Sequence, residues 1–310
     1  MKLNLIKHRK IYLWIPVALM AVSLAAILFK GLNYGIDFSG GNLFQVVYEK
    51  PVTLADVNAA LDKVSPDISQ MNATSRKVQL SDDRIVILRS QEITEDEKDK
   101  VLETLKSVGD YKVEKIEKVG ASVGEDLKFA AIYSLVIGSI LIVIYITIRF
   151  EFIFAVGSIA ALAHDVLLAL GLVVILGYEV NTPFIAAILT IVGYSINDTI
   201  VIFDRMRENL KAKRRLRLTT EQIFENSVNQ CLRRSVNTSV TTFFAVLALL
   251  IFGGESLRTF IVALLVGVTA GAYSSIFMAP LIVYLLSRGG KKLEEFAEKD
   301  KDEQEEKILV

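Results

Sequence analysis

The chain has 310 residues, of which 52% are hydrophobic and 23% are charged, and its formal net charge is zero. The balanced charge gives no support to binding of nucleic acid, so none is expected as a partner. A single cysteine, Cys231, excludes an intrachain disulfide. The composition lies between that of a soluble domain and that of a pure membrane bundle, so we expect both in one chain.

Six apolar runs are long enough to cross a lipid bilayer, since a helix needs roughly 20 such residues to do so. The first run follows a basic N-terminus, and its long apolar stretch favours an uncleaved signal anchor over a cleaved signal peptide. The sequence therefore predicts a polytopic α-helical membrane protein with six transmembrane helices. The runs are 11–29, 129–148, 152–176, 183–203, 236–252 and 259–286.

Basic residues predict how these spans are oriented. Nine of them lie from Arg205 to Arg234, whereas the short loops GYEVNTP and GGESLR contain only Arg258. Short loops rich in Lys and Arg stay in the cytoplasm. The predicted organisation is a cytoplasmic N-terminus (1–10), a transmembrane helix (11–29), an extracytoplasmic domain (30–128), a five-helix bundle (129–288) with a basic cytoplasmic loop (204–235), and a cytoplasmic charged tail (289–310).

The extracytoplasmic segment has the pattern of a small α+β domain. Alternating apolar residues predict strands at GNLFQVVYE, RKVQL, RIVILRS and YKVEKIEKV. TLADVNAALDKV and TEDEKDKVLETLKSV are typical of amphipathic helices, and Thr94 and Glu97 form a capping box at the start of the second. The order β-α-β-β-α-β indicates a ferredoxin-like domain. Its sequence contains no metal-ligand spacing and no nucleophile motif, so we expect a handle or a binding surface and not a catalyst, without metal or cofactor.

Three of the predicted spans carry polar side chains, which are costly in a bilayer and mark functional sites there. Tyr194 and Asp198 are four residues apart and share a helix face, as do Arg234 and Thr238. Small residues, including the GxxxG of Gly267, would let these helices approach closely. The candidate site residues are His164 and Asp165 in the third span, Tyr194, Ser195, Asn197 and Asp198 in the fourth, and Arg233, Arg234 and Thr238 at the start of the fifth.

Each polar residue has a structural and a functional interpretation. The hydroxyl of Ser195 suits hydrogen bonding between helices, whereas Asn197 fits either role. Asp165 is either a structural partner of His164 or a functional acid. For Asp198 we expect proton transport, because a carboxyl group out of water holds its proton more readily and a nearby arginine opposes this. Movement of Arg234 relative to Asp198 would then couple protonation to conformation.

Enzymatic motifs are missing from the sequence. An aspartyl intramembrane protease would need a GxGD setting, but the chain has AHD and IND. A serine type would need GxSG, and the chain has GYSIN. The phosphate-binding pattern G-x-x-x-x-G-K-[ST] is also missing from the sequence. We therefore expect that the chain is not an enzyme.

Several motifs resemble the SecF family, which belongs with SecD to the resistance-nodulation-division superfamily. They are GLNYGIDFSGGNL, ALAHDV, VGYSINDTIVIFDRMREN and FGGESLRTF, and the resemblance extends in order and spacing to about residue 288. In the extracytoplasmic segment it covers Gly35, Asp37, Gly40 and Gly41.

This resemblance implies an accessory subunit of the Sec protein translocase in the bacterial cytoplasmic membrane. The implied partners are a SecD half, the SecYEG channel, the ATPase SecA and exported preproteins, and the proton gradient would promote late steps of export. The family's acid and arginine for proton passage fall on Asp198 and Arg234, with Arg233 as the alternative, and Asp165 has the family's HD position. Two other functions stay open: half of a proton-driven small-molecule exporter, and a scaffold that conducts no protons.

Overall fold

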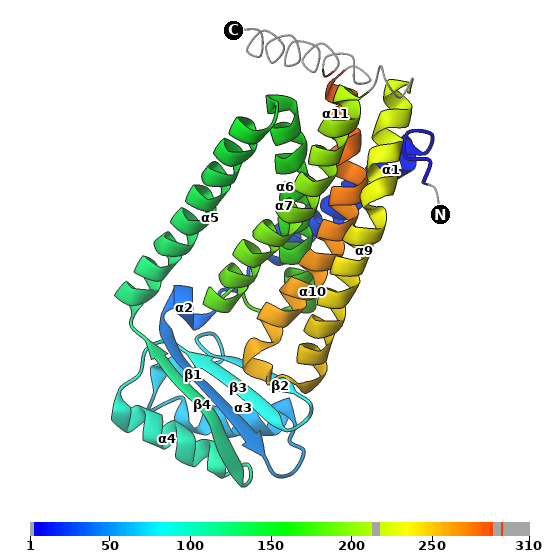
Figure 1. Cartoon of the computed structure of the whole chain (residues 1–310). Helices are drawn as coiled ribbons and strands as arrows, with labels where there is room; N and C mark the ends of the chain where they lie inside the picture. Colours follow the sequence, from blue (N-terminus) through cyan, green and yellow to red (C-terminus); the bar gives the residue numbers. More distant parts are fainter. Residues whose placement is uncertain (1–2, 213–217, 288–292, 294–310) are drawn as a thin grey trace. The chain divides into compact units, whose positions relative to one another are not determined.

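The computed structural model describes residues 3–212, 218–287 and 293, which fall into two compact units. One unit comprises Met1–Asn33 and Ser134–Val310, and the other comprises Tyr34–Tyr133. The first is a helical bundle, and the second contains the only sheet among the described residues (Figure 1).

The smaller unit is ferredoxin-like, as predicted. Its antiparallel sheet has the strand order β2-β3-β1-β4, and the chain order of its main elements is β-α-β-β-α-β. Both agree with the pattern expected from the sequence. The elements are α2 (Ile36–Ser39), β1 (Gly41–Tyr48), α3 (Leu54–Val64), η1 (Ser69–Met71), β2 (Lys77–Ser81), β3 (Ile85–Ser90), α4 (Glu95–Lys106) and β4 (Tyr111–Val119).

The core of this unit forms between the sheet and the apolar faces of its two main helices. Phe44 of β1, Leu61 of α3 and Val101 of α4 belong to one buried cluster and are fully shielded from solvent. The predicted capping box at the start of α4 is present, because Thr94 and Glu97 each bind the other's backbone N–H group. Local capping and apolar periodicity therefore define this unit together.

The GIDFSGG segment forms a short helix, α2, that the sequence did not predict. Its glycines have conformational reasons: Gly40 has a φ angle of 69° and Gly41 one of 116°, both unfavourable for other residues. A Cβ atom at position 41 would lie 2.2 Å from the carbonyl oxygen of Ser90. The double glycine therefore lets the chain leave α2 and pair closely in the sheet.

The larger unit is a multi-pass bundle, and the predicted six spans are confirmed by six helices of sufficient length and hydropathy. The last span is continuous through three labelled elements. The helices are α1 (Arg9–Lys30), α5 (Ala121–Arg149), α6 (Phe152–Leu176), α7 (Thr182–Lys211), α9 (Thr220–Phe252), and α10 (Arg258–Tyr273) followed by η3 (Ser274–Met278) and α11 (Ala279–Leu286).

Helices extend well beyond the predicted apolar runs. In the segment expected as a loop, 204–235, α7 continues to Lys211 and α9 already begins at Thr220. Hydropathy marks only the part of a helix that is apolar, whereas the backbone continues wherever polar residues support it. Here Thr219 and Gln222 form a capping box for α9, a signal that lay outside the apolar run.

Small residues bring the central helices into close contact. A Cβ atom at Gly267 of α10 would lie 2.3 Å from the side chain of Ile191 in α7, and one at Gly157 of α6 would lie 2.7 Å from Val283 in α11. Such contacts replace the hydrophobic effect as the source of helix association in lipid. The resulting core of α6, α7 and the last span positions the polar residues described next.

Candidate functional site

Asp165 lies at the centre of a closed hydrogen-bond cluster. Its Oδ1 atom is 2.9 Å from Nδ1 of His164, and its Oδ2 atom accepts hydrogen bonds from Ser195 Oγ (2.6 Å) and Ser274 Oγ (2.8 Å). All four side chains are almost completely buried. The cluster therefore joins α6, α7 and η3 through one carboxyl group whose two oxygens both have partners.

A second hydroxyl pair extends this cluster. Ser275 Oγ donates to the backbone carbonyl of Ser195 over 3.1 Å and lies 2.9 Å from Thr199 Oγ1. Ser274 and Ser275 stand at the start of the π-helical turn η3. Pro280, shortly after this turn, lacks an N–H group and disfavours regular α-helical geometry behind it. The wide turn thus places two consecutive hydroxyls toward α6 and α7.

His164 connects the cluster to an apolar groove. Its Nε2 atom is buried and has no hydrogen-bond partner among the described residues. The side chain lines a groove of about 370 Å³ between α1, α6 and α10, together with Tyr273 and Leu19. One edge of the imidazole ring is therefore satisfied by Asp165, and the rest of the ring lies against apolar side chains.

Asp198 lies apart from this cluster, along a polar seam between α7 and α9. Three hydrogen bonds define the antiparallel register of the seam. They are Tyr194 Oη to Thr242 Oγ1 (3.2 Å), Arg205 Nε to Gln230 Oε1 (2.5 Å) and Asn209 Nδ2 to Ser227 Oγ (2.8 Å). In this register Asp198 is level with Thr238, and Arg234 lies one helical turn away, roughly 6 Å along the axis.

The carboxyl group of Asp198 is not fully satisfied. The residue is only 4% exposed, and its buried Oδ2 atom has no hydrogen-bond partner among the described residues. Arg234 is the charged residue that acts on it electrostatically. The hydroxyl of Thr238 does not compensate, because it donates to the carbonyls of Arg234 and Ser235 in its own helix. An incompletely solvated acid thus lies beside a basic residue.

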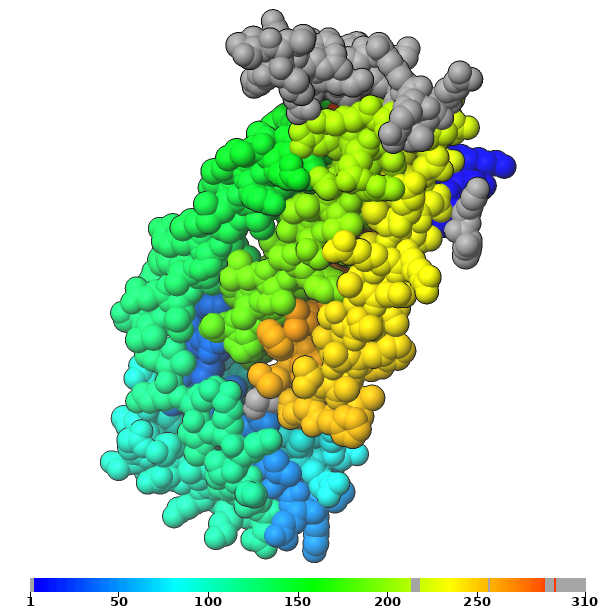
Figure 2. Space-filling model, in the orientation of Figure 1, coloured from blue at the N-terminus to red at the C-terminus, as the bar shows by residue number. Residues whose placement is uncertain are grey.

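The seam lies at the surface of the chain. Asn197, Arg233, Arg234 and Thr238 are all exposed, and Tyr194 is partly exposed. Figure 2 shows α7 and α9 side by side on the face turned to the viewer. The side chain of Asp198 is therefore buried directly behind an open polar surface.

The predicted site residues thus separate into two groups. Asp165, His164 and Ser195 form the closed cluster, whereas Asp198, Asn197, Tyr194, Arg233, Arg234 and Thr238 belong to the open seam. Gly35, Asp37, Gly40 and Gly41 belong to the smaller unit. Ser275 was not among the predicted site residues, although its position on the helix that carries the GxxxG motif was a signal. Among the described residues there is no cluster of His, Cys, Asp and Glu suited to a metal ion.

The chain is thus a multi-pass membrane protein, with buried acids in its helical bundle and a ferredoxin-like domain between its first two spans. Two family descriptions match the chain. "Protein export membrane protein SecD/SecF, C-terminal" matches residues 99–289, and "SecD/SecF GG Motif" matches residues 25–52. The chain belongs to the SecD/SecF family of protein export membrane proteins, which confirms the resemblance stated from its motifs.

Relatives and a solved structure agree with this family. "Protein translocase subunit SecF" of Sebaldella termitidis is 47% identical over 100% of both chains, and the protein of the same name from Calditerrivibrio nitroreducens is 39% identical over 89% of this chain and 91% of its own. The crystal structure of SecDF, a translocon-associated membrane protein from Thermus thermophilus, matches with a TM-score of 0.84 and 33% identity. The match covers 93% of this chain but only 39% of that longer chain.

Proposed function

We propose that this chain is a SecF-type subunit of the protein translocase that uses the proton gradient to promote late steps of protein export. The observation that carries the proposal is the environment of Asp198. This acid is buried at the α7–α9 seam, and its Oδ2 atom has no hydrogen-bond partner among the described residues. An ionised carboxylate is costly inside a membrane, so an acid kept there indicates a function, which we take to be the exchange of a proton.

The exposed side of the seam supports a membrane partner similar to this chain, a SecD-like half. Arg234 and Asn197 are exposed beside Asp198, and unpaired polar surface of this sort is unfavourable against lipid. A SecD-like half packed on α7 and α9 would cover this surface and complete a proton path. In the assembled complex the partners would be SecD, the SecYEG channel, SecA and the exported preproteins.

The seam also favours Arg234 over Arg233 as the arginine of this path. Both arginines are exposed, but Arg234 is the one that acts electrostatically on Asp198. A separation of about one helical turn leaves room for a small shift of α9 to bring the two charges together or to part them. Protonation of Asp198 would remove that attraction, so its proton occupancy would bias the position of α9.

The decisive experiment is export driven by an imposed proton gradient, measured in vesicles that contain the assembled complex with Asp198→Asn. We expect loss of the gradient-dependent part of export with unchanged assembly, because asparagine keeps the shape but cannot exchange a proton. Asp204→Asn is the matched control: it lies on the same helix but is half-exposed and paired with Arg149. It should leave the gradient dependence intact.

The two alternative functions make different predictions in this assay. A scaffold that conducts no protons would keep the full gradient-dependent export in Asp198→Asn, and that result would refute the proposed coupling. Half of a small-molecule exporter would leave export of preproteins unaffected by deletion of the whole chain. We further propose that the subunit is not an enzyme. Its contribution to export should therefore involve no covalent change in the exported preprotein.

A further inference from the structure

The groove between α1, α6 and α10 is large enough for a ligand. Its volume of about 370 Å³ is more than twice the roughly 150 Å³ of an apolar cavity that holds a benzene molecule. On the α1 side, Ile15 and Leu19 line the groove and are 43% and 46% exposed. The groove is therefore accessible to molecules dissolved in the membrane.

One polar atom in the wall of the groove has no partner. Nε2 of His164 is unpaired among the described residues, and this side chain is only 1% exposed. The two hydroxyl groups of the wall are both engaged. Tyr273 donates to the carbonyl oxygen of Tyr12 over 3.0 Å, and Thr269 donates to a carbonyl of its own helix. The groove thus presents a single unpartnered polar atom to whatever fills it.

The bond from Tyr273 also fixes the wall of the groove. Pro16 lacks an N–H group, so the carbonyl of Tyr12, four residues earlier, has no donor within α1. Tyr273 of α10 supplies that donor, and the ring of Tyr12 stacks on Phe277 with 4.5 Å between the ring centroids. α1 is therefore attached to the last span beside the groove, which gives the groove a defined shape.

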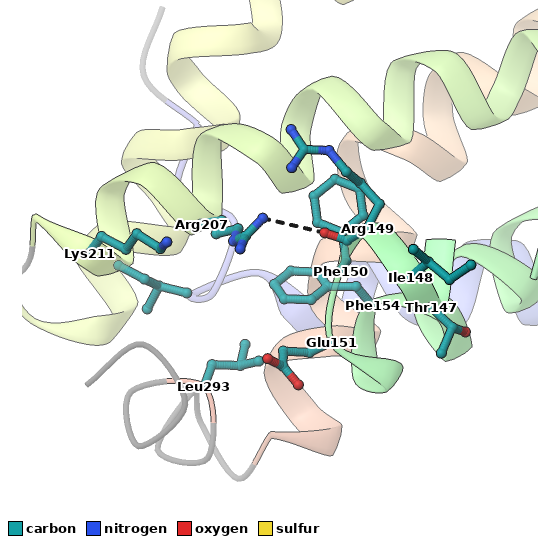
Figure 3. A pocket seen from close by; sticks show the side chains of 10 residues that line it. Thr147, Ile148, Arg149, Phe150, Glu151, Phe154, Arg207, Lys211 and Leu293 are labelled. Atoms are coloured by element: carbon teal, nitrogen blue, oxygen red, sulfur yellow. Dashed lines mark hydrogen bonds between the residues drawn. The ribbon is translucent and has the colours of Figure 1, made fainter. Parts of the chain in front are cut away.

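A pocket at the ends of α5 and α7 differs in this respect (Figure 3). It has a volume of about 280 Å³, and its wall includes Arg207, which donates a hydrogen bond of 3.3 Å to the carbonyl oxygen of Arg149. None of its described lining residues has a buried side-chain nitrogen or oxygen without a partner. The unpartnered nitrogen therefore distinguishes the groove at His164 from this pocket.

This nitrogen selects the polar group of a ligand. Nδ1 of the same ring is 2.9 Å from Oδ1 of Asp165. When Nδ1 carries the only ring proton, Nε2 is an acceptor, and when Nε2 carries a proton, it is a donor. A hydroxyl group both donates and accepts, so it satisfies Nε2 in either state. Water is a poorer occupant, because an ordered water needs several polar partners and the groove provides one unpartnered atom.

The depth of His164 limits the rest of the ligand. The residue lies midway between Phe152 and Leu176, about 18 Å from either end of α6. A charged group at this depth in a bilayer is costly, so the headgroup of a phospholipid does not reach it. The described residues that line the groove include no Asp, Glu, Lys or Arg. The ligand is therefore uncharged and largely apolar.

We propose that this groove binds an uncharged membrane alcohol, whose hydroxyl group bonds Nε2 of His164 and whose hydrocarbon part lies against Leu168 and Leu265. An isoprenoid alcohol and a quinol share this chemistry. Such a ligand would complete the hydrogen bonding of His164 and so stabilise the cluster around Asp165. The site is separate from proton coupling, since neither Asp198 nor Arg234 lines the groove.

The test measures photolabelling of the full chain in phosphatidylcholine nanodiscs. One probe is dodecanol with a diazirine group beside the hydroxyl, and the other is the same hydrocarbon without the hydroxyl. Mass spectrometry of peptides locates the label. We expect saturable labelling of the groove by the alcohol, on the order of tenfold stronger than by the hydrocarbon, which is the ratio that one hydrogen bond supplies.

His164→Asn tests the hydrogen bond to the ligand. Asparagine places an amide group near the position of Nδ1, beside Asp165, but has no atom at the position of Nε2. Labelling by the alcohol should therefore fall to the level of the hydrocarbon. An unchanged thermal unfolding midpoint would show that the bundle is intact.

Thr269→Trp and Val22→Trp form a matched pair that tests the groove itself. Thr269 is exposed and lines the groove, so a tryptophan there should fill it and abolish labelling by both probes. Val22 is 59% exposed on α1 but does not line the groove. The same bulk at position 22 should leave labelling unchanged, and this pair decides the question even where His164→Asn does not fold.

Three results would overturn the proposal. If the hydrocarbon labels the groove as strongly as the alcohol, the occupant is an acyl chain. If His164→Asn folds and keeps the preference for the alcohol, Nε2 does not bind the hydroxyl. If Val22→Trp lowers labelling as much as Thr269→Trp does, the label does not report the groove.

Competition with unlabelled molecules separates the two sources of the hydroxyl group. Farnesol represents the isoprenoid alcohols, and decylubiquinol represents the quinols. The competitor that displaces the dodecanol probe at the lower concentration identifies the class of ligand. If neither displaces the probe, the groove does not recognise a membrane alcohol and the proposal is wrong.

Discussion

The two buried acids of the bundle, Asp165 and Asp198, have opposite environments. Asp165 has hydrogen-bond partners on both oxygens, supplied by His164, Ser195 and Ser274. Asp198 has an oxygen without a partner among the described residues. Both acids are almost completely buried, so depth alone does not distinguish them. The difference lies in how fully the surrounding helices satisfy each carboxyl group.

We expect this difference in hydrogen bonding to separate a structural acid from a functional one. A fully bonded carboxyl group joins three helices and resists any change of its protonation, because each change would disrupt several hydrogen bonds. An incompletely bonded carboxyl group has less to lose when it takes up or releases a proton. We therefore expect Asp165 to act mainly in stability and Asp198 mainly in the transport cycle.

Alanine substitution at the two acids should show the largest contrast. We expect Asp165→Ala to destabilise the bundle by about 3 kcal/mol, because it removes the acceptor of the buried Ser195 hydroxyl and the partner of an imidazole nitrogen, and leaves Ser274 with the carbonyl of Gly271. Asp198→Ala should change stability by less than about 1 kcal/mol, since it removes an acid whose solvation was already incomplete. Thermal unfolding in detergent measures both. Equal destabilisation by the two substitutions would show that the acids do not differ in this way.

Glycine positions give a second, smaller contrast between closed and open regions. Gly267→Ala should cost about 2 kcal/mol, because its new Cβ atom would lie 2.3 Å from the side chain of Ile191 and the helices would have to separate. Gly193, on α7, has no atom within 4 Å of its ideal Cβ position. Gly193→Ala should therefore be neutral or stabilise the helix by up to about 1 kcal/mol. The same unfolding measurement distinguishes them, and a loss at position 193 as large as that at 267 would contradict the packing argument.

The sequence predicted the architecture because the signals for it are local. Apolar runs identify the six spans, and period-two and helical patterns identify the strands and helices of the ferredoxin-like unit. The predicted apolar runs 183–203 and 236–252 cover only part of their helices: α7 continues to Lys211 and α9 begins at Thr220, because hydropathy does not detect a helix that continues as a polar surface. The short helix α2 was also missed, since the two glycines that follow it approach residues far along the chain, Gly41 the carbonyl of Ser90 and Gly40 the backbone of Ala121.

The site could be predicted only in part. Helical spacing correctly indicates which residues of one helix share a face, and so it places Tyr194 beside Asp198. It does not show which helices meet, so the bond from Ser195 to Asp165 and the contribution of Ser275 came only from the structure. The π-helical turn at Ser274 is invisible to a pattern with a period of 3.6 residues.

A third acid, Glu97 in the smaller unit, tests what the same kind of bonding contributes in water. Thr94 donates to its carboxylate through the backbone N–H group (2.8 Å) and through Oγ1 (2.9 Å), and these bonds lower the pKa of Glu97. A lowered pKa in the folded state stabilises the fold above the ordinary pKa of glutamate, and this stabilisation is lost as the pH falls through the folded-state pKa.

Thr94→Ala should therefore cost about 1 kcal/mol at pH 7 as a lost helix cap, and this cost should shrink below about pH 4, when Glu97 becomes protonated. Hydrogen exchange of the α4 amides, corrected for the intrinsic rate at each pH, measures the effect. Thr104→Ala is the control on the same helix, because the Thr104 hydroxyl donates to the backbone carbonyl of Lys100 and not to a carboxylate, so its loss should give a cost independent of pH. If the cost of Thr94→Ala does not change with pH, the carboxylate contributes nothing to the cap. If Thr94→Ala destabilises the fold by less than Asp165→Ala does, the hydrogen bonds of an exposed carboxylate contribute less to stability than those of a buried one.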